Sequence, residues 1–150
     1  MMLFALFKVL CAAVSVSLAA GLLARDHGLK ANRLIAAFLF CNAYWALLEF
    51  FLYQTNDPED ALRYYRFMSI GWVPLGTLCA HASLTLSTLE RHRFERFLPL
   101  CYAGLAIVLP LAISTDWVIR GAEPISLGWQ ATFGPGTVSY THLRAHETSE

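Results

Sequence analysis

Residues 34–53 read LIAAFLFCNAYWALLEFFLY, a run of twenty residues in which Glu49 alone carries a charge. A helix rises about 1.5 Å per residue, so about 20 apolar residues cross a hydrocarbon layer about 30 Å thick. Lipid offers no partners to backbone N–H and C=O groups, and only a helix bonds its own backbone within one segment. The run therefore predicts a membrane-spanning helix.

Three further apolar runs accompany this one, and short polar breaks separate them. They cover residues 2–24, 65–89 and 97–114. In the whole chain 57% of the residues are hydrophobic and 15% are charged, against about 45–50% and about 25% in soluble domains. None of the runs alternates between apolar and polar residues, as a strand of a membrane β-barrel would. The predicted fold class is all-α, a polytopic transmembrane helix bundle with about four spans.

The composition argues against several classes of function. The formal net charge is zero, so nothing indicates a nucleic-acid partner. The sequence has no glycine-rich phosphate loop, no nucleophile with a plausible base and no paired carboxylates within a span, so we expect neither an enzyme nor a bound cofactor. The four cysteines lie in apolar runs, where they should pack as small hydrophobic residues and form neither disulfides nor a metal site: Cys11, Cys41, Cys79 and Cys101.

The distribution of Lys and Arg predicts the orientation, because cytoplasmic loops carry the excess of positive charge. The breaks after the first and third spans hold six basic residues: Arg25, Lys30, Arg33, Arg91, Arg93 and Arg96. The opposite side holds four: Lys8, Arg63, Arg66 and Arg120. We therefore expect a multi-pass inner-membrane protein with its N-terminus outside. The alternative is a signal peptide cleaved near Ser17-Leu18-Ala19, which would leave the first basic break outside, against the charge rule.

The end of the chain does not continue the pattern. The segment from Thr115 to Gly136 is interrupted by Gly and Pro, so we do not expect it to span. Residues 137–150 are polar and lack a hydrophobic face, and Val138–Thr148 resembles translated sequencing-adapter read-through. We expect a non-native tail on an N-terminal fragment, the alternative being a natural disordered tail. In either case His142 and His146, although four residues apart, are not interpreted as a metal site.

Polar residues inside the spans are informative, because each costs free energy in lipid unless it has a partner. Glu49 and Arg66 lie at comparable depth on consecutive antiparallel helices, which predicts an ion pair between them; a ligand-sensing or proton-sensing role is the alternative. His81 is interpreted as the donor or acceptor of an interhelical hydrogen bond rather than as a haem ligand, and Asn42 is interpreted in the same way.

Two further patterns concern helix packing. In Gly71-Trp72-Val73-Pro74-Leu75-Gly76, Pro74 removes a backbone hydrogen bond and predicts a kink. A broken helix can line a ligand cavity, but it can equally serve packing alone. Ala13, Ser17 and Gly21 recur every fourth residue of the first span, and such a stripe of small residues permits close helix approach.

Several short motifs, taken in order, carry a resemblance to a known family. They are Tyr44-Trp45-Ala46-Leu47-Leu48-Glu49, an acidic loop with Arg66 after it, Gly71-Trp72-Val73-Pro74, Ser114-Thr115-Asp116-Trp117, Gly128-Trp129 and Phe133-Gly134-Pro135-Gly136. Residues 1–136 resemble the N-terminal seven-transmembrane region found ahead of bacterial sensor histidine kinases and some diguanylate cyclases. The resemblance implies the first four of seven helices and an N-terminus outside. The output domain would belong to the full-length parent, through which a homodimer would form.

These observations lead to the hypothesis of a sensory input module. Such a module lies in the lipid bilayer, responds to a small-molecule or membrane cue and biases a cytoplasmic output domain. The ligand-binding or structural candidates are the polar residues and the third-span residues named above: Asn42, Glu49, Arg66, Trp72, Pro74 and His81. The kinked third span is the element expected to move. The alternative is a fragment of a secondary transporter, which would require inverted repeats, or of another polytopic membrane protein.

Overall fold

The computed structural model describes residues 2–87, 95–125 and 128–135. Within these ranges the chain forms four helices and one hairpin: α1 (Met2–Asp26), α2 (Lys30–Leu52), α3 (Pro58–Leu86), α5 (Leu98–Ser114), β1 (Ile119–Ile125) and β2 (Gly128–Phe133). The expected non-native tail 137–150 lies outside the described residues, as do Arg91 and Arg93 of the second basic break.

Three of the predicted spans are confirmed as helices long and apolar enough to cross a membrane, namely α1, α2 and α3. The third begins seven residues earlier than predicted. Asp57 caps it by accepting a hydrogen bond from the backbone N–H of Glu59 at 3.2 Å, and Pro58 occupies its first turn, both of which favour a helix start. The fourth run forms a shorter helix of 17 residues, α5.

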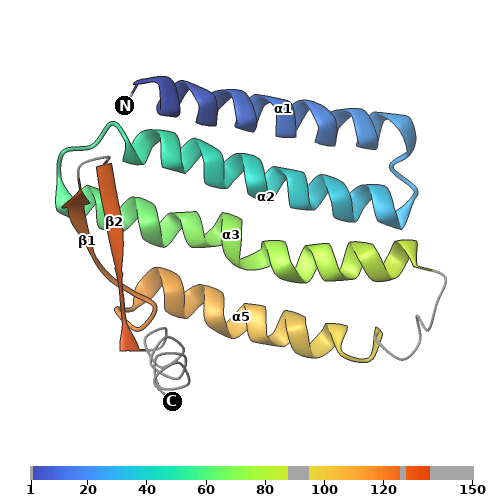
Figure 1. The fold of residues 1–150 in the computed structure, drawn as a ribbon. Coiled ribbons are helices and arrows are strands. Elements are labelled where there is room, and N and C mark those ends of the chain that lie inside the picture. The colour runs from blue at the N-terminus through green and yellow to red at the C-terminus, as the bar shows by residue number, and fades with distance from the viewer. Residues whose placement is uncertain (1, 88–94, 126–127, 136–150) are drawn as a thin grey trace, which may run out of the picture.

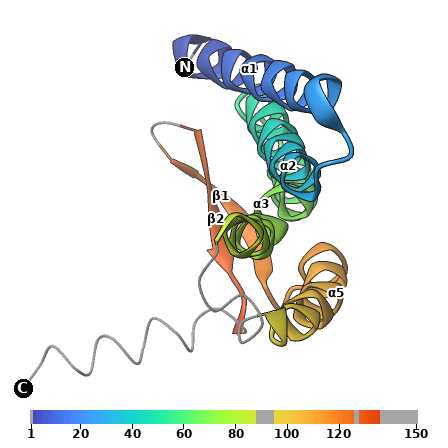
Figure 2. The same ribbon diagram turned by 90° about the vertical axis from the view of Figure 1, so that its right-hand side faces the viewer.

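The helices form an open row in which each packs mainly on the helix before or after it in the chain. The principal helix contacts join α1 to α2, α2 to α3 and α3 to α5, and consecutive helices run antiparallel (Figure 1). Seen along the helices, the row is curved, with α1 at one edge and α5 at the other (Figure 2). We call the end of the row that carries the N-terminus and the two strands the hairpin end, and the opposite end the far end.

The prediction of an all-α fold is wrong for the segment after α5. There β1 and β2 pair antiparallel, with Ala122 opposite Ala131 and Ile125 opposite Gly128. Gly128 has φ +135°, a conformation that side chains rarely adopt, and a Cβ there would lie 3.2 Å from the Tyr53 ring. Gly128, one of the glycines that argued against a helix, thus adopts this conformation at the start of β2. The hairpin lies across α3 at the hairpin end (Figures 1 and 2).

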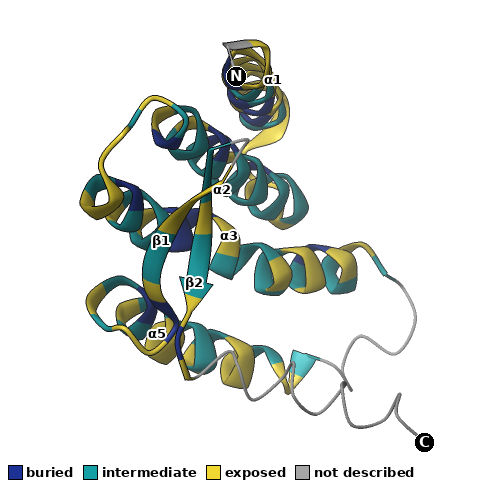
Figure 3. Ribbon diagram, turned by 60° about the vertical axis from the view of Figure 1, so that its left-hand side comes forward, coloured by how far each residue is buried: buried dark blue, intermediate teal, exposed yellow. Residues whose placement is uncertain are grey.

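The small-residue face of α1 is not the predicted one. Ala13, Ser17 and Gly21 are exposed, whereas Ala12 is buried against Ala43 and Ala46 of α2. The contact with α2 therefore uses a stripe one residue out of phase with the prediction. Figure 3 shows buried residues as narrow stripes on helices whose remaining surface is open, as expected where lipid covers the rest.

A close helix approach joins α2 to α3 at Gly71. A Cβ on this glycine would lie 2.8 Å from the backbone carbonyl oxygen of Cys41 and 2.8 Å from Cβ of Trp45. Three residues later Pro74 lies inside α3, and the ribbon of α3 shows a loosened turn near its middle (Figure 1). Pro74 thus lies within α3 three residues after this close approach, and the kink at Pro74 stays a prediction.

Candidate functional site

Polar contacts join α1 to α2 at two levels. Asn42 donates a hydrogen bond from Nδ2 to Ser15 Oγ at 3.0 Å, and Lys8 Nζ lies 2.7 Å from Glu49 Oε2. Glu49 follows Asn42 by seven residues, or two helical turns, so both project from the face of α2 that meets α1. Asn42 thus makes the interhelical bond predicted for it.

The predicted ion pair between Glu49 and Arg66 is wrong. Among the described residues Glu49 pairs with Lys8, and Arg66 pairs with Asp116 in the segment between α5 and β1. Glu49 and Arg66 do lie near the same end of the row, as predicted. A comparable depth in the membrane does not, however, bring their side chains into contact. The carboxylate of Glu49 reaches Lys8 on α1 instead.

Three polar contacts fasten the hairpin to the helices. Tyr65 donates its hydroxyl proton to the backbone carbonyl of Trp129 at 2.6 Å. Trp129 in turn donates its indole N–H to the backbone carbonyl of Thr55 at 3.0 Å, in the loop between α2 and α3. The ion pair of Arg66 with Asp116 is the third contact. The bonds join segments 50 to 74 residues apart in sequence, so they fix the hairpin over α3.

An aromatic groove lies between α2, α3 and the hairpin. Its volume is about 340 Å³, and its lining is almost wholly carbon. Trp72, one of the predicted site residues, is 38% exposed and lines the groove. The residues that form the groove are Trp45, Tyr65, Met68, Trp72, Ile119, Ala131 and Phe133. Such a surface can bury an apolar or aromatic group, and it presents no nucleophile.

Two apolar clusters support the groove from beneath. Leu52, Ala61 and Met68 are buried together, with Trp45 and Trp129 packed against them. A second cluster buries Ala112 of α5 with Val118 and Ile119, which places the start of β1 against Tyr65 and Ala131. The hairpin end is therefore a packed unit, and the groove is built from side chains that this packing holds in position.

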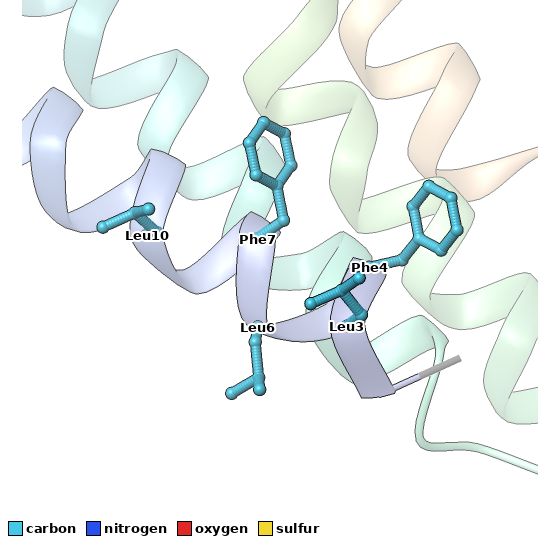
Figure 4. Close-up of a pocket in the computed structure, with 5 residues that line it drawn as sticks. All are labelled: Leu3, Phe4, Leu6, Phe7 and Leu10. Atoms are coloured by element: carbon cyan, nitrogen blue, oxygen red, sulfur yellow. The ribbon is translucent and has the colours of Figure 1, made fainter.

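A second hollow in the described part of the chain is of a different kind. It measures about 550 Å³ and is formed by Leu3, Phe4, Leu6, Phe7 and Leu10. Figure 4 shows that all five side chains come from the first three turns of α1, and each is at least 57% exposed. A surface formed by one edge helix is what acyl chains contact in a bilayer, so we interpret it as a lipid-facing surface.

The remaining predicted residues lie away from the groove. His81 Nδ1 is 2.8 Å from the hydroxyl oxygen of Tyr102 on α5, with the two rings edge to face, which is the interhelical bond predicted for this histidine. Pro74 lies between the groove and His81 along α3. In the part of the chain that the structure describes, no group of three or more His, Cys, Asp or Glu side chains is placed to hold a metal ion.

Several contributors to the site were not predicted as such. Lys8 entered the sequence prediction only as a positive charge that bears on orientation. A charge within an apolar span requires a partner, and that requirement was the signal for the pairing of Lys8 with Glu49. Asp116 was named only within the motif Ser114-Thr115-Asp116-Trp117, without a predicted partner. Tyr65 and Trp129 carry the hairpin contacts, and nothing in the sequence indicated that they meet.

Comparison of the chain with protein-family models, with curated proteins and with solved structures finds no match. The chain is a mostly helical protein with three helices long and apolar enough to cross a membrane, together with a small hairpin.

Proposed function

We propose that this chain is the membrane-embedded sensory input module of a bacterial signal-transduction protein of the histidine kinase or diguanylate cyclase type, of which it forms the N-terminal part. The observation that carries the proposal is the aromatic groove beneath a hairpin fastened to α3. A preformed apolar pocket with few polar groups is typical of a small-molecule site. The ligand class that fits it is an apolar or aromatic molecule that reaches the groove from the bilayer or from outside.

The polar groups within the helices favour a sensor over a transporter. Secondary transporters bind substrate and coupling ions near the middle of the membrane, often at interrupted helices. Here the mid-depth polar side chains of α1 and α2, Ser15 and Asn42, bond to each other. The charge of Lys8 is balanced by Glu49. These groups stabilise helix packing, and the groove at the hairpin end is left for ligand.

The proposed orientation places the hairpin end outside. Lys8 counts against this orientation even though it pairs with Glu49, because the charge rule counts Lys and Arg and acidic residues contribute little to it. The six basic residues in the breaks after the first and third spans outnumber the four on the opposite side. Cysteine labelling in intact cells tests the orientation, on a background with the four native cysteines replaced. Asp57→Cys should react with an impermeant maleimide, whereas His27→Cys should react only after the membrane is permeabilised. The opposite pattern would invert the proposed topology.

The function itself is tested in two steps. Sequencing of the source locus should reveal further hydrophobic spans and a kinase or cyclase domain after Gly136; a locus without an output domain would refute the proposal. The full-length protein is then assayed in nanodiscs for autophosphorylation or cyclic di-GMP synthesis. Trp72→Ala should change the basal output about fivefold, since about 1 kcal/mol of bias between two states has that effect. Phe67→Ala is the matched control, because Phe67 is exposed on α3 outside the groove.

A further inference from the structure

We infer that the far-end halves of α3 and α5 form one rigid unit that swings on two proline hinges, Pro74 and Pro110, against a fixed remainder. Pro110, like Pro74, lies inside its helix. An interior proline removes one backbone hydrogen bond and displaces the carbonyl four residues earlier, so the helix bends most readily there. The sequence predicts a kink at Pro74, and Pro110 is its counterpart on α5.

The two prolines lie at the same level of the row. His81 and Tyr102 are in contact across the antiparallel pair α3 and α5. Pro74 precedes His81 by seven residues and Pro110 follows Tyr102 by eight, so at about 1.5 Å per residue they lie about 10 Å and about 12 Å from this contact, both toward the hairpin end. Two hinges at one level define one axis, about which both helices can bend together.

On the hairpin side of the hinges the helices are held firmly. Gly71 brings α3 against the backbone of α2, with room for no side chain. Tyr65 is bonded to the hairpin, and Ser69 is fully buried. On α5, Ala112 is fully buried with Val118 and Ile119. This side is therefore the fixed body.

On the far side of the hinges Ala82 alone among the described residues of α3 and α5 is buried, against five on the hairpin side. A Cβ added to Gly76 or Gly104 would meet nothing within 4 Å. Leu86 is 63% exposed and Leu100 is 70% exposed. The contact between His81 and Tyr102 ties the two half-helices to each other, so they move together. The movement of the two half-helices follows from the hinges alone. Its role as the response to a ligand rests on the proposed function.

Pulsed electron paramagnetic resonance on the whole chain in nanodiscs tests the hinge, with the native cysteines replaced. Spin labels at Arg33 and Leu100, both exposed at the far end, report the unit against α2. Labels at Phe51 and Ser114 report the fixed body. We expect the first distance distribution to be the broader one. Pro74→Ala combined with Pro110→Ala should narrow the distance distribution between Arg33 and Leu100 about twofold, because the restored hydrogen bonds stiffen both helices. The distribution between Phe51 and Ser114 should stay unchanged.

Two controls keep the result interpretable. Pro58→Ala removes a proline from the first turn of α3, where it breaks no hydrogen bond, and should leave both distributions unchanged. Tyr102→Phe should broaden the distribution between labels at Ser83 and Ala103, which lie on the two half-helices. Equal widths for the two original pairs, or no response to the double proline replacement, would overturn the hinge. The proposed function would fail separately, through the absence of an output domain.

Discussion

At the hairpin end of the row, bonds join segments far apart in the sequence, whereas the described bonds between helices at the far end join neighbouring helices. The hairpin end contains the contacts of Tyr65 and Arg66 with the segment after α5. The far end contains the contact of His81 with Tyr102 and the hydrogen bond from Asn32 Nδ2 to the backbone carbonyl of Asp26 at 2.8 Å. Rigidity in this chain therefore originates at the hairpin end. The hairpin and the segment before it are held by bonds to distant residues, and the same bonds link the ends of α2, α3 and α5.

The largest effect on the difference between the two ends is expected from a substitution that separates α2 from α3. Gly71→Val should destabilise the protein by about 3 kcal/mol, because its Cβ would overlap the backbone of α2 and the helices would have to move apart. The measurement is unfolding by SDS titration in mixed micelles, followed by tryptophan fluorescence. Gly76→Val is the matched control on the same helix, since a Cβ there meets nothing within 4 Å. If both variants unfold alike, the close approach at Gly71 is not real.

The next largest effect concerns the ion pair of α1 and α2. Lys8→Gln alone and Glu49→Gln alone should each cost about 1–2 kcal/mol, because each leaves one partly buried charge unpaired. The double variant should recover part of this loss in a double-mutant cycle. A parallel cycle of Glu49 with Arg66 should be additive, since these two residues have different partners. Coupling of Glu49 to Arg66 instead of Lys8 would restore the pair predicted from the sequence.

A tyrosine hydroxyl at each end allows a matched comparison. Tyr65→Phe should cost about 1 kcal/mol, because it leaves the Trp129 carbonyl without this donor. Hydrogen exchange in β1 and β2 should then become faster, while exchange at the far end stays unchanged. Tyr64→Phe, which retains the ring stacked on Phe51, is the control. Uniform acceleration across the chain would mean that the hairpin is not an independently fastened unit.

The smallest effect is expected at the far end. Tyr102→Phe removes the contact with His81 and should cost about 0.6 kcal/mol, the average for a hydrogen bond between membrane helices. Exchange should accelerate in the far-end halves of α3 and α5 and stay unchanged in the hairpin. A loss as large as that of Tyr65→Phe, or one that spreads to the hairpin, would remove the distinction between the two ends.

The sequence predicted most of the helical architecture, because hydropathy over about twenty residues reports directly on the cost of burying a backbone in lipid. The interhelical bonds of Asn42 and His81 followed from the same cost applied to side chains. The partners of Glu49 and Arg66 did not follow, because matching depth ignores the direction in which each side chain leaves its helix.

The hairpin and the groove were beyond prediction for a different reason. Short strands rich in Gly and Pro have little periodicity of their own, and β1 and β2 are held by residues such as Tyr65 and Thr55 that lie far earlier in the chain. The groove combines Trp45, Trp72 and Phe133 from three elements. Contacts of such long sequence separation leave no local pattern in a single sequence.

The open row also implies an order of assembly during synthesis. Because each helix packs mainly on its chain neighbours, α1, α2 and α3 can dock one after another as they enter the membrane, and contacts between neighbouring segments form fast. Trp129 reaches back 74 residues to Thr55, so the hairpin can close only after α3 and α5, which lie between these two residues, have been synthesised. Its closure is thus the step that converts a series of docked helices into one body, and the ribosome must have completed residue 133 before that body exists.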